Sequence, residues 1–294
     1  MTRRIIVLGD VMTDFVASIP HAPSAGSDTA ARIRSHGGGS AANTAAWLAD
    51  LRAPVTLVAR VGADALGDAA TAELVGAGVD LRVTRDPAEA SGMCLVLVTP
   101  DGERTMVPDP GANARLSAAD IPADLLAPGS HLHVSGYALF REGSRAAARH
   151  AMTLARASGA TLSVDASSRV PLETVGAADF LAWARPADLL FANADEALVL
   201  TGVPQPEAAA RTLADAFGLA VVKAGADGAV VASADGDTWR VAAQAAEARD
   251  TTGAGDAFAA GFLAVWCAGS PVPDALANAT RTAARAVARS GGRP

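Results

Sequence analysis

The 294-residue chain contains few aromatic residues and only two cysteines. Phe, Trp and Tyr together make up 4% of the sequence, and Tyr137 is its single tyrosine. Two cysteines exclude a disulfide-rich secreted scaffold, and Cys94 and Cys267 both lie in apolar surroundings typical of a protein core. Half of the residues are apolar, which is enough to bury a large core in a chain of this length.

The sequence also lacks a long hydrophobic run and an excess of positive charge. The apolar run 5–8 breaks at Gly9-Asp10, too early for the apolar region of a signal peptide, and no run reaches membrane-spanning length. The formal net charge is −7, which gives no support for binding to nucleic acid or to a membrane. We therefore expect a cytoplasmic protein that acts on a small molecule.

Short β-rich runs alternate with Ala- and Leu-rich helical stretches along most of the chain. This alternation predicts an α/β fold with a doubly wound, mainly parallel sheet covered by helices on both faces. No linker divides the sequence, so we expect a single domain over 1–294. The predicted strands are 5–8, 55–59, 94–98, 132–134, 162–164, 189–191, 220–222 and 229–231, and the predicted helices include 144–157, 206–217 and 273–288.

Two segments depart from this rhythm, at about 14–36 and about 91–110. The first is polar and rich in turns, and the second reads as a hairpin around Pro100-Asp101-Gly102-Glu103. Taken alone, both segments are predicted to be surface hairpins.

The most informative motif is Asp250-Thr251-Thr252-Gly253-Ala254-Gly255-Asp256, followed by an apolar helix expected at about 257–268. Gly253, Ala254 and Gly255 have little or no side chain, so their backbone N–H groups can approach an anion closely beside the positive end of the helix. Asp256 at this junction is a candidate general base for phosphoryl transfer. The alternative is an ordinary helix cap formed by Thr and Asp.

A second glycine-rich segment, Gly37-Gly38-Gly39-Ser40-Ala41-Ala42-Asn43, also leads into an Ala-rich helix, which ends near Leu51. Together the two motifs resemble those of the ribokinase (PfkB) family of carbohydrate and nucleoside kinases, which pairs an N-terminal Gly-Gly motif with a C-terminal D-T-x-G-A-G-D signature. The resemblance covers nearly the whole chain. It implies a ribokinase-like fold, in which the segments at about 14–36 and 91–110 form a β lid, and a reaction that uses ATP and Mg²⁺.

The resemblance also implies roles for individual residues. Asp14, Gly38, Gly39 and Asn43 match positions that hold the acceptor's hydroxyl groups, and Tyr137 either packs on the acceptor or belongs to the core. The remaining implied positions are Asn193 and Glu196 of an N-x-x-E motif for Mg²⁺ through water, Lys223, Gly225 and Gly228 beside the nucleotide, and Asn278 at the adenine.

Some positions depart from the family pattern or stay open. Ser40 and Met12 stand where ribose kinases usually carry Lys and Asn, which argues against free ribose as the acceptor. Asp250 and Thr252, with the segment 287–292, resemble a monovalent-cation site, and a requirement for K⁺ stays open. Asp165 ends a predicted strand, where it either organises the phosphates or forms a turn.

We therefore expect an ATP-dependent kinase that phosphorylates a primary hydroxyl of a sugar or ribosyl compound, with Asp256 as the base. The alternatives are a nucleoside kinase, for example one that acts on pseudouridine, and a non-catalytic sugar sensor on the same fold. A homodimer formed through the lid is a further expectation.

Overall fold

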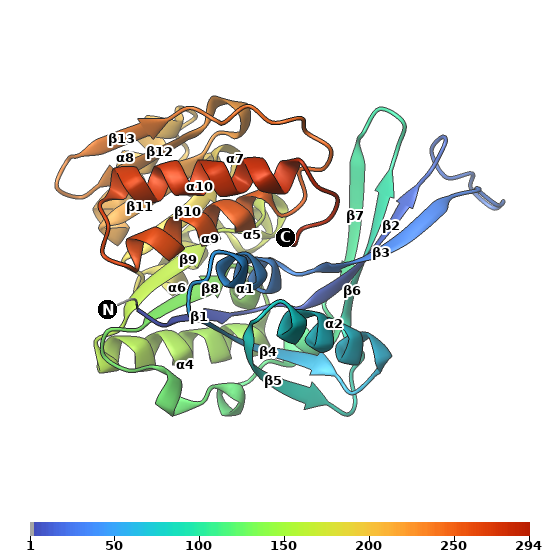
Figure 1. Ribbon diagram of the computed structural model, residues 1–294, viewed down its shortest axis with the longest axis horizontal. Helices are drawn as coiled ribbons and strands as arrows, with labels where there is room; N and C mark the ends of the chain where they lie inside the picture. The colour runs from blue at the N-terminus through green and yellow to red at the C-terminus, as the bar shows by residue number, and fades with distance from the viewer. Residues whose placement is uncertain (1–2) are drawn as a thin grey trace.

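The computed structural model describes residues 3–294, which form a layered α/β body and a small sheet that projects from it (Figure 1). The nine strands of the large sheet have the order β13-β12-β11-β10-β9-β8-β1-β4-β5. Neighbouring strands from β11 to β5 are parallel, and β12 and β13 are added in antiparallel pairs. The strands are β1 (Ile5–Leu8), β4 (Val55–Gly62), β5 (Asp80–Asp86), β8 (His131–Ser135), β9 (Thr161–Asp165), β10 (Leu189–Asn193), β11 (Leu219–Lys223), β12 (Ala229–Ser233) and β13 (Thr238–Val241).

Helices cover both faces of this sheet, as the alternating sequence pattern predicts. Side chains alternate along a strand, so Ile5 and Val7 of β1 pack on one face, and Ile6 and Leu8 pack on the other. The first face carries α1 (Ser40–Asp50), α2 (Ala65–Gly76), α9 (Ala254–Trp266) and α10 (Val272–Val287). The second face carries α3 (Tyr137–Phe140), α4 (Glu142–Ser158), α5 (Arg169–Val175), α6 (Ala177–Ala184), α7 (Ala194–Thr201) and α8 (Pro206–Phe217).

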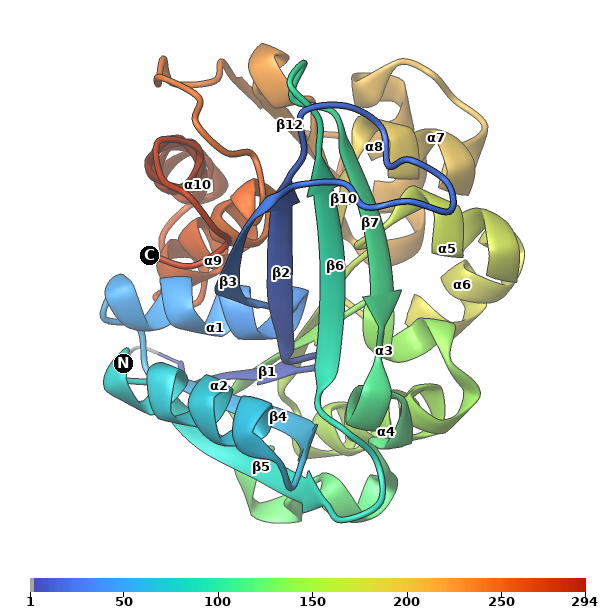
Figure 2. The ribbon, with the colours of Figure 1, turned by 90° about the vertical axis from the view of Figure 1, so that its right-hand side faces the viewer.

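The projecting sheet is the lid expected from the two irregular segments, and Figure 2 shows its four strands side by side. Its order is β3-β2-β6-β7, with β2 (Met12–Ser18), β3 (Arg32–Gly38), β6 (Gly92–Val98) and β7 (Arg104–Asp109). Strands β2 and β6 pair in parallel, and this pairing joins the two segments into one sheet. Neither segment is therefore an isolated surface hairpin.

Three elements differ from the sequence-based expectations. The edge strands β5 and β13 carry exposed or half-buried polar residues, so neither has the apolar run that marks the central strands. Helix α9 begins at Ala254 and not at Ala257, which places Gly255 and Asp256 inside its first turn.

Within residues 3–294, no helix has the length and apolarity required to cross a bilayer.

Candidate active site

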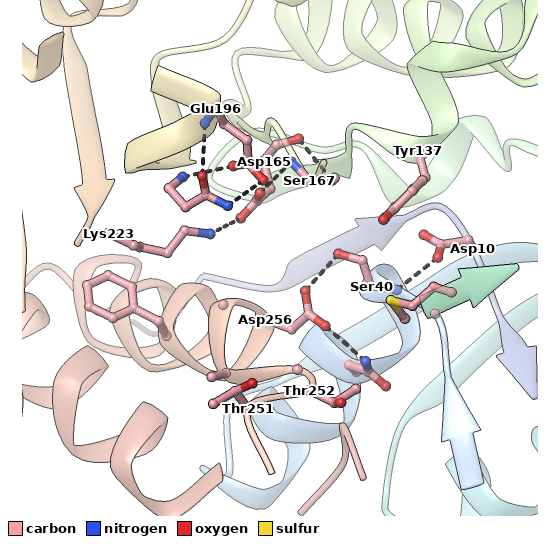
Figure 3. A pocket seen from close by; sticks show the side chains of 18 of the residues that line it. Asp10, Ser40, Tyr137, Asp165, Ser167, Glu196, Lys223, Thr251, Thr252 and Asp256 are labelled. Carbon is pink, nitrogen blue, oxygen red and sulfur yellow. Dashed lines mark hydrogen bonds and ion pairs between the residues drawn. The ribbon is translucent and has the colours of Figure 1, made fainter. Parts of the chain in front are cut away.

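A cavity of about 1340 Å³ lies between the lid and the loops at the carboxyl ends of the parallel strands. Open α/β sheets bind ligands at this edge. The wall includes lid residues such as Arg104 and Met106, and α10 residues such as Thr280 and Val287. Asp256 also lines the cavity, and Figure 3 shows its side chain pointing toward that of Ser40.

The first turn of α9 places backbone N–H groups beside Asp256. The helix is preceded by Gly253 in the left-handed conformation, with φ of 71°, and the N–H of Ala257 donates to the carbonyl of Gly253 at 2.8 Å. A Cβ atom on Gly253 would lie 2.6 Å from the backbone of Gly292, so this position accepts only glycine. The N–H of Ala254 donates to the carbonyl of Thr251 at 3.3 Å, whereas the N–H groups of Gly255 and Asp256 precede the first intrahelical donor and are directed toward the N-terminal end of the helix.

Two side chains of α1 hold the carboxylate of Asp256. The hydroxyl of Ser40 donates to Asp256 Oδ1 at 2.8 Å, and the amide of Asn43 donates to Asp256 Oδ2 at 2.9 Å (Figure 3). Burial raises the pKa of Asp256 to about 7, although the hydrogen bonds from Asn43 and Ser40 lower it. A carboxyl group with this pKa can accept a proton near neutral pH, as a general base must.

Ser40 and Asp10 are site residues that the sequence reasoning did not select. Asp10 follows β1 and accepts hydrogen bonds from the N–H of Ser40 at 2.8 Å and from the hydroxyl of Ser135 at 3.0 Å, so it fixes the start of α1. The signal for Asp10 was a carboxylate at the C-terminal end of the first parallel strand. Ser40 was noted only as a departure from lysine, and its contact with Asp256 joins segments 216 residues apart.

The predicted acceptor-binding residues lie together at the junction of the lid and α1. Asp14 of β2 is 8% exposed, and a Cβ atom on Gly38 would overlap its carboxylate. Gly39 has φ of 92°, and a Cβ there would lie 2.6 Å from the Asp10 carbonyl. Burial raises the pKa of Asp14 to about 6, and the charge of Arg293 opposes this rise.

Asn43 connects this acceptor end with the base. Its Nδ2 donates to Asp256, and its Oδ1 is buried and has no hydrogen-bond partner within residues 3–294. A buried acceptor without a partner is costly, and an acceptor hydroxyl can satisfy it.

The opposite wall of the acceptor end is partly aromatic. Tyr137 begins α3, lines the cavity and is 39% exposed, so it does not belong to the core. Its ring packs edge-to-face on Phe140, with 5.8 Å between the ring centroids. Met106, Val170 and Pro171 line the same cavity. This wall offers an apolar surface for the flat face of a ring.

The N-x-x-E motif forms the N-terminal cap of α7. Asn193 Oδ1 accepts from the N–H of Glu196 at 2.9 Å, and the two Glu196 carboxylate oxygens accept from the backbone and the side chain of Asn193, each at 2.8 Å. Burial raises the pKa of Glu196 to about 7, against the charge of Lys223. Both residues line the cavity and supply oxygen atoms, which suit Mg²⁺, and the bonds already made favour contact with the ion through water.

Lys223 and Asp165 form an ion pair in the wall of the cavity. Lys223 Nζ lies 2.8 Å from Asp165 Oδ2, and both residues end parallel strands (Figure 3). Of the two readings of Asp165, its position in the cavity wall favours a role at the phosphates. The N–H of Ser167 donates to Asp165 Oδ1 at 2.8 Å, so the turn is present as well.

Of the other residues predicted to lie beside the nucleotide, Gly225 and Gly228 line the cavity and Asn278 does not. Gly225 and Gly228 line the cavity with φ of 58° and 90°, and a Cβ on Gly228 would overlap the Val241 carbonyl. Asn278 is not among the lining residues, and its amide donates to the Gly261 carbonyl at 2.8 Å. Because Gly261 has no side chain, α9 and α10 approach closely and hold Asn278 between them. Asn278 therefore lies outside the cavity wall in this structure, whereas Thr280 and other α10 residues line it, and the adenine contact of Asn278 stays a prediction.

Asp250 and Thr252 are brought together, but a lid residue already contacts both of them. Arg104 Nη2 lies 2.7 Å from Asp250 Oδ1, and Arg104 Nη1 donates to Thr252 Oγ1 at 2.6 Å. Asp250 Oδ2 accepts from the N–H of Gly291 at 3.0 Å. The two side chains proposed for a monovalent cation are thus occupied by a guanidinium, and they do not fit a bound ion in this arrangement.

These features agree with a comparison against known families. The model of the pfkB family carbohydrate kinases matches residues 2–294. The chain belongs to the pfkB family of carbohydrate kinases. The family predicted from the two glycine-rich motifs is therefore confirmed. The pfkB chain is a kinase of the carbohydrate and nucleoside class.

Relatives of this pfkB chain act on several acceptors. An ATP-dependent ribose-1-phosphate kinase of Halopiger xanaduensis is 33% identical over 292 residues, which are 99% of this chain and 94% of the relative. The crystal structure of adenosine kinase from Sinorhizobium meliloti has a TM-score of 0.91 at 26% identity, over 100% of this chain and 96% of that one. A fructokinase double mutant from Vibrio cholerae O395, bound to fructose, ADP and potassium ion, has a TM-score of 0.83 at 27% identity, over 99% and 94% of the two chains.

Proposed function

We propose that this chain transfers the γ-phosphoryl group of ATP to a primary hydroxyl of a sugar or ribosyl compound, with Asp256 as the general base. The observation that carries the proposal is the position of Asp256 in the first turn of α9, where it is bonded to Asn43 and lies beside the backbone N–H groups that open the helix. A pKa of about 7 suits this carboxylate for proton transfer near neutral pH.

The geometry supports the following step. The acceptor hydroxyl loses its proton to Asp256, its oxygen forms a bond to the γ-phosphorus, and the bond from that phosphorus to the bridging oxygen of ADP breaks. The N–H groups of Gly255 and Asp256 stabilise the negative charge on the transferred group. Lys223 and its partner Asp165 lie at the phosphate side.

Asn193 and Glu196 are the residues that we propose for Mg²⁺, held through water. When bound, Mg²⁺ neutralises charge on the phosphate oxygens of the nucleotide. The residues themselves fix the first turn of α7 at the cavity wall, which keeps their oxygens in one place. A homodimer formed through the lid, where Ile33 and Met106 are exposed, and a cytoplasmic location stay predictions.

Two observations guide the choice of acceptor. The similarity to a ribose-1-phosphate kinase, with the cationic side chain of Arg141 in the cavity wall, favours a phosphorylated ribose. The aromatic wall at Tyr137 and Phe140 and the high structural similarity to an adenosine kinase favour a nucleoside. Both acceptors carry a ribosyl ring, so we propose a ribosyl compound as the acceptor class.

The experiment is a panel assay with the purified chain, ATP and Mg²⁺. The acceptors are ribose, fructose, ribose 1-phosphate, adenosine and pseudouridine, and the readouts are ADP release and ³¹P NMR of the product. We expect acceptor-dependent ADP release in a one-to-one ratio with a new phosphate monoester, greatest for a ribosyl compound. Acceptor binding measured by calorimetry without any turnover would instead indicate the sugar sensor.

A further inference from the structure

The lid residue Arg104 contacts the loop that begins the anion hole. Arg104 is the first residue of β7, and its guanidinium reaches Asp250 and Thr252 at 2.7 Å and 2.6 Å across a sequence separation of about 148 residues. The Arg104 side chain is 26% exposed and that of Asp250 is 18% exposed, so the pair is largely removed from water. A guanidinium fork that bonds two neighbouring oxygens is geometrically specific.

The carboxylate of Asp250 already contacts three donor groups, and the only cation among them is the guanidinium of the lid. Oδ1 accepts from the N–H of Thr252 at 2.8 Å and from Arg104, and Oδ2 accepts from the N–H of Gly291 at 3.0 Å. Burial alone would raise the pKa of Asp250, but hydrogen bonds from Gly291 and Thr252 and the charge of Arg104 lower it. The group is therefore an ionised carboxylate whose charge is balanced by the lid.

The loop held in this way leads directly into the catalytic turn. Thr252 precedes Gly253, the N-cap residue of α9, and the N–H of Asp250 donates to the carbonyl of Val287 at 3.2 Å. Any shift of Thr252 therefore moves the first N–H groups of α9, which form the proposed anion hole. Because Arg104 belongs to the lid, its contact ties the position of these N–H groups to the position of the lid.

We infer that Arg104 is a built-in cation that takes the place of a bound monovalent ion at Asp250 and Thr252, and that it is a positioning residue for the anion hole. The kinase reaction of this chain is therefore independent of K⁺. The inference rests on the proposed function for its kinetic consequences. Its prediction about ion binding holds whether or not the chain is a kinase.

The first test measures kcat at constant ionic strength in potassium, sodium and tetramethylammonium chloride. Wild type and Arg34→Ala should give the same kcat in all three salts, since Arg34 lies exposed on β3 of the same sheet and does not line the cavity. Arg104→Ala should lose roughly 10–100-fold in tetramethylammonium, the effect of a small misplacement of catalytic groups, and should regain most of it with K⁺ or with millimolar guanidinium. The kcat of Arg104→Lys in tetramethylammonium should lie between that of wild type and that of Arg104→Ala.

The second test measures thermal unfolding in the same salts. K⁺ should raise the Tm of Arg104→Ala above its value in tetramethylammonium and leave the Tm of wild type unchanged, because only the variant has free oxygens at Asp250 and Thr252. A wild-type kcat that depends on K⁺ would overturn the inference. So would an Arg104→Ala protein that keeps full kcat in tetramethylammonium, or one that K⁺ neither reactivates nor stabilises. If no acceptor is turned over, the thermal test alone decides.

Discussion

The side-chain amide of Asn43 donates a hydrogen bond of 2.9 Å to the carboxylate of Asp256, although 213 residues separate the two. Asn43 lies near the start of α1 and Asp256 near the start of α9, and the two helices pack on the same face of the sheet. The other amide atom of Asn43, Oδ1, has no hydrogen-bond partner in the part of the chain that the structure describes. One side chain therefore contacts the base and offers an acceptor atom to a substrate hydroxyl.

The pH dependence of the reaction should report the ionisation of Asp256. Its pKa is raised to about 7, so kcat/KM should increase with pH and level off above about 7, as the carboxylate form becomes dominant. The Ser40 hydroxyl donates to Asp256 and lowers its pKa. Ser40→Ala should therefore move the midpoint upward by on the order of one pH unit, since a hydrogen bond to a charged group contributes about 1.5–3 kcal/mol.

The Ser40→Ala variant also distinguishes the titration of Asp256 from that of Glu196, whose pKa is likewise raised to about 7. Glu196 is bonded to Asn193 and not to Ser40. A pH profile with the same midpoint in wild type and Ser40→Ala would assign the titration to another group than Asp256.

The charge of Asp256 should lower the stability of the folded chain above neutral pH. A folded pKa of about 7 lies above the ordinary value of 3.8, so the unfolded chain releases this proton first and stability falls as pH rises between the two values. Asp256→Asn lacks this ionisation. Calorimetry should show the Tm of the variant, relative to wild type, increasing from pH 5 to pH 8, and a constant difference would contradict the shifted pKa.

Much of the fold was predictable because local signals and tertiary packing agree. The buried strands from β8 to β12 are short apolar runs, and α8 matches its predicted bounds from Pro206 to Phe217. Edge strand β5 was not predictable in this way, because its sequence, Asp80–Asp86, is mostly polar and most of its residues are exposed or half-buried. The start of α9 was predicted too late in the sequence, because small residues such as Ala254 and Gly255 can adopt either a turn or a helix.

In the candidate site, too, some residues carry a local sequence signal and others depend on contacts between distant segments. The glycine-rich motifs pointed to Asp256 and Asn43, because small residues before a helix mark a local backbone geometry that the sequence reveals, and the family resemblance pointed to Asp14. The contact of Ser40 with Asp256 and that of Arg104 with Asp250 join distant segments, so no local pattern indicates them. The position of Asn278 depends on the close packing of α9 and α10, which is likewise a tertiary property.

Glu196 should affect the metal and not the acceptor. Glu196→Gln keeps side-chain oxygen and amide groups that can still cap α7, but it removes the charge proposed to hold the Mg²⁺ water shell. The Mg²⁺ concentration at half-maximal rate should rise, and the acceptor KM should change little. Asp195→Asn is the matched control, since Asp195 is exposed in the same helical turn. Loss of acceptor affinity at unchanged Mg²⁺ dependence would refute this role for Glu196.

Asp14 and Asn43 should recognise vicinal hydroxyl groups of the acceptor. A carboxylate accepts two hydrogen bonds and an amide both donates and accepts, so the pair suits a cis-diol. Deleting the 2- or 3-hydroxyl of the best acceptor should lower kcat/KM at least about tenfold, because buried polar groups then lose their partners. Asp14→Ala should remove most of this discrimination. Equal turnover of the deoxy analogues by wild type would show that the two residues do not bind a diol.

The kcat of Asp256→Asn on the best acceptor tests the central claim most directly. The variant should retain its fold and its affinity for ATP, measured by circular dichroism and calorimetry, while kcat falls by about 10²–10⁴-fold, the usual contribution of general-base catalysis. The matched control is Asp274→Asn, which removes an exposed carboxylate from the first turn of the neighbouring helix α10 and should keep wild-type kcat. A kcat of Asp256→Asn within about tenfold of wild type would remove Asp256 from the mechanism and contradict this account.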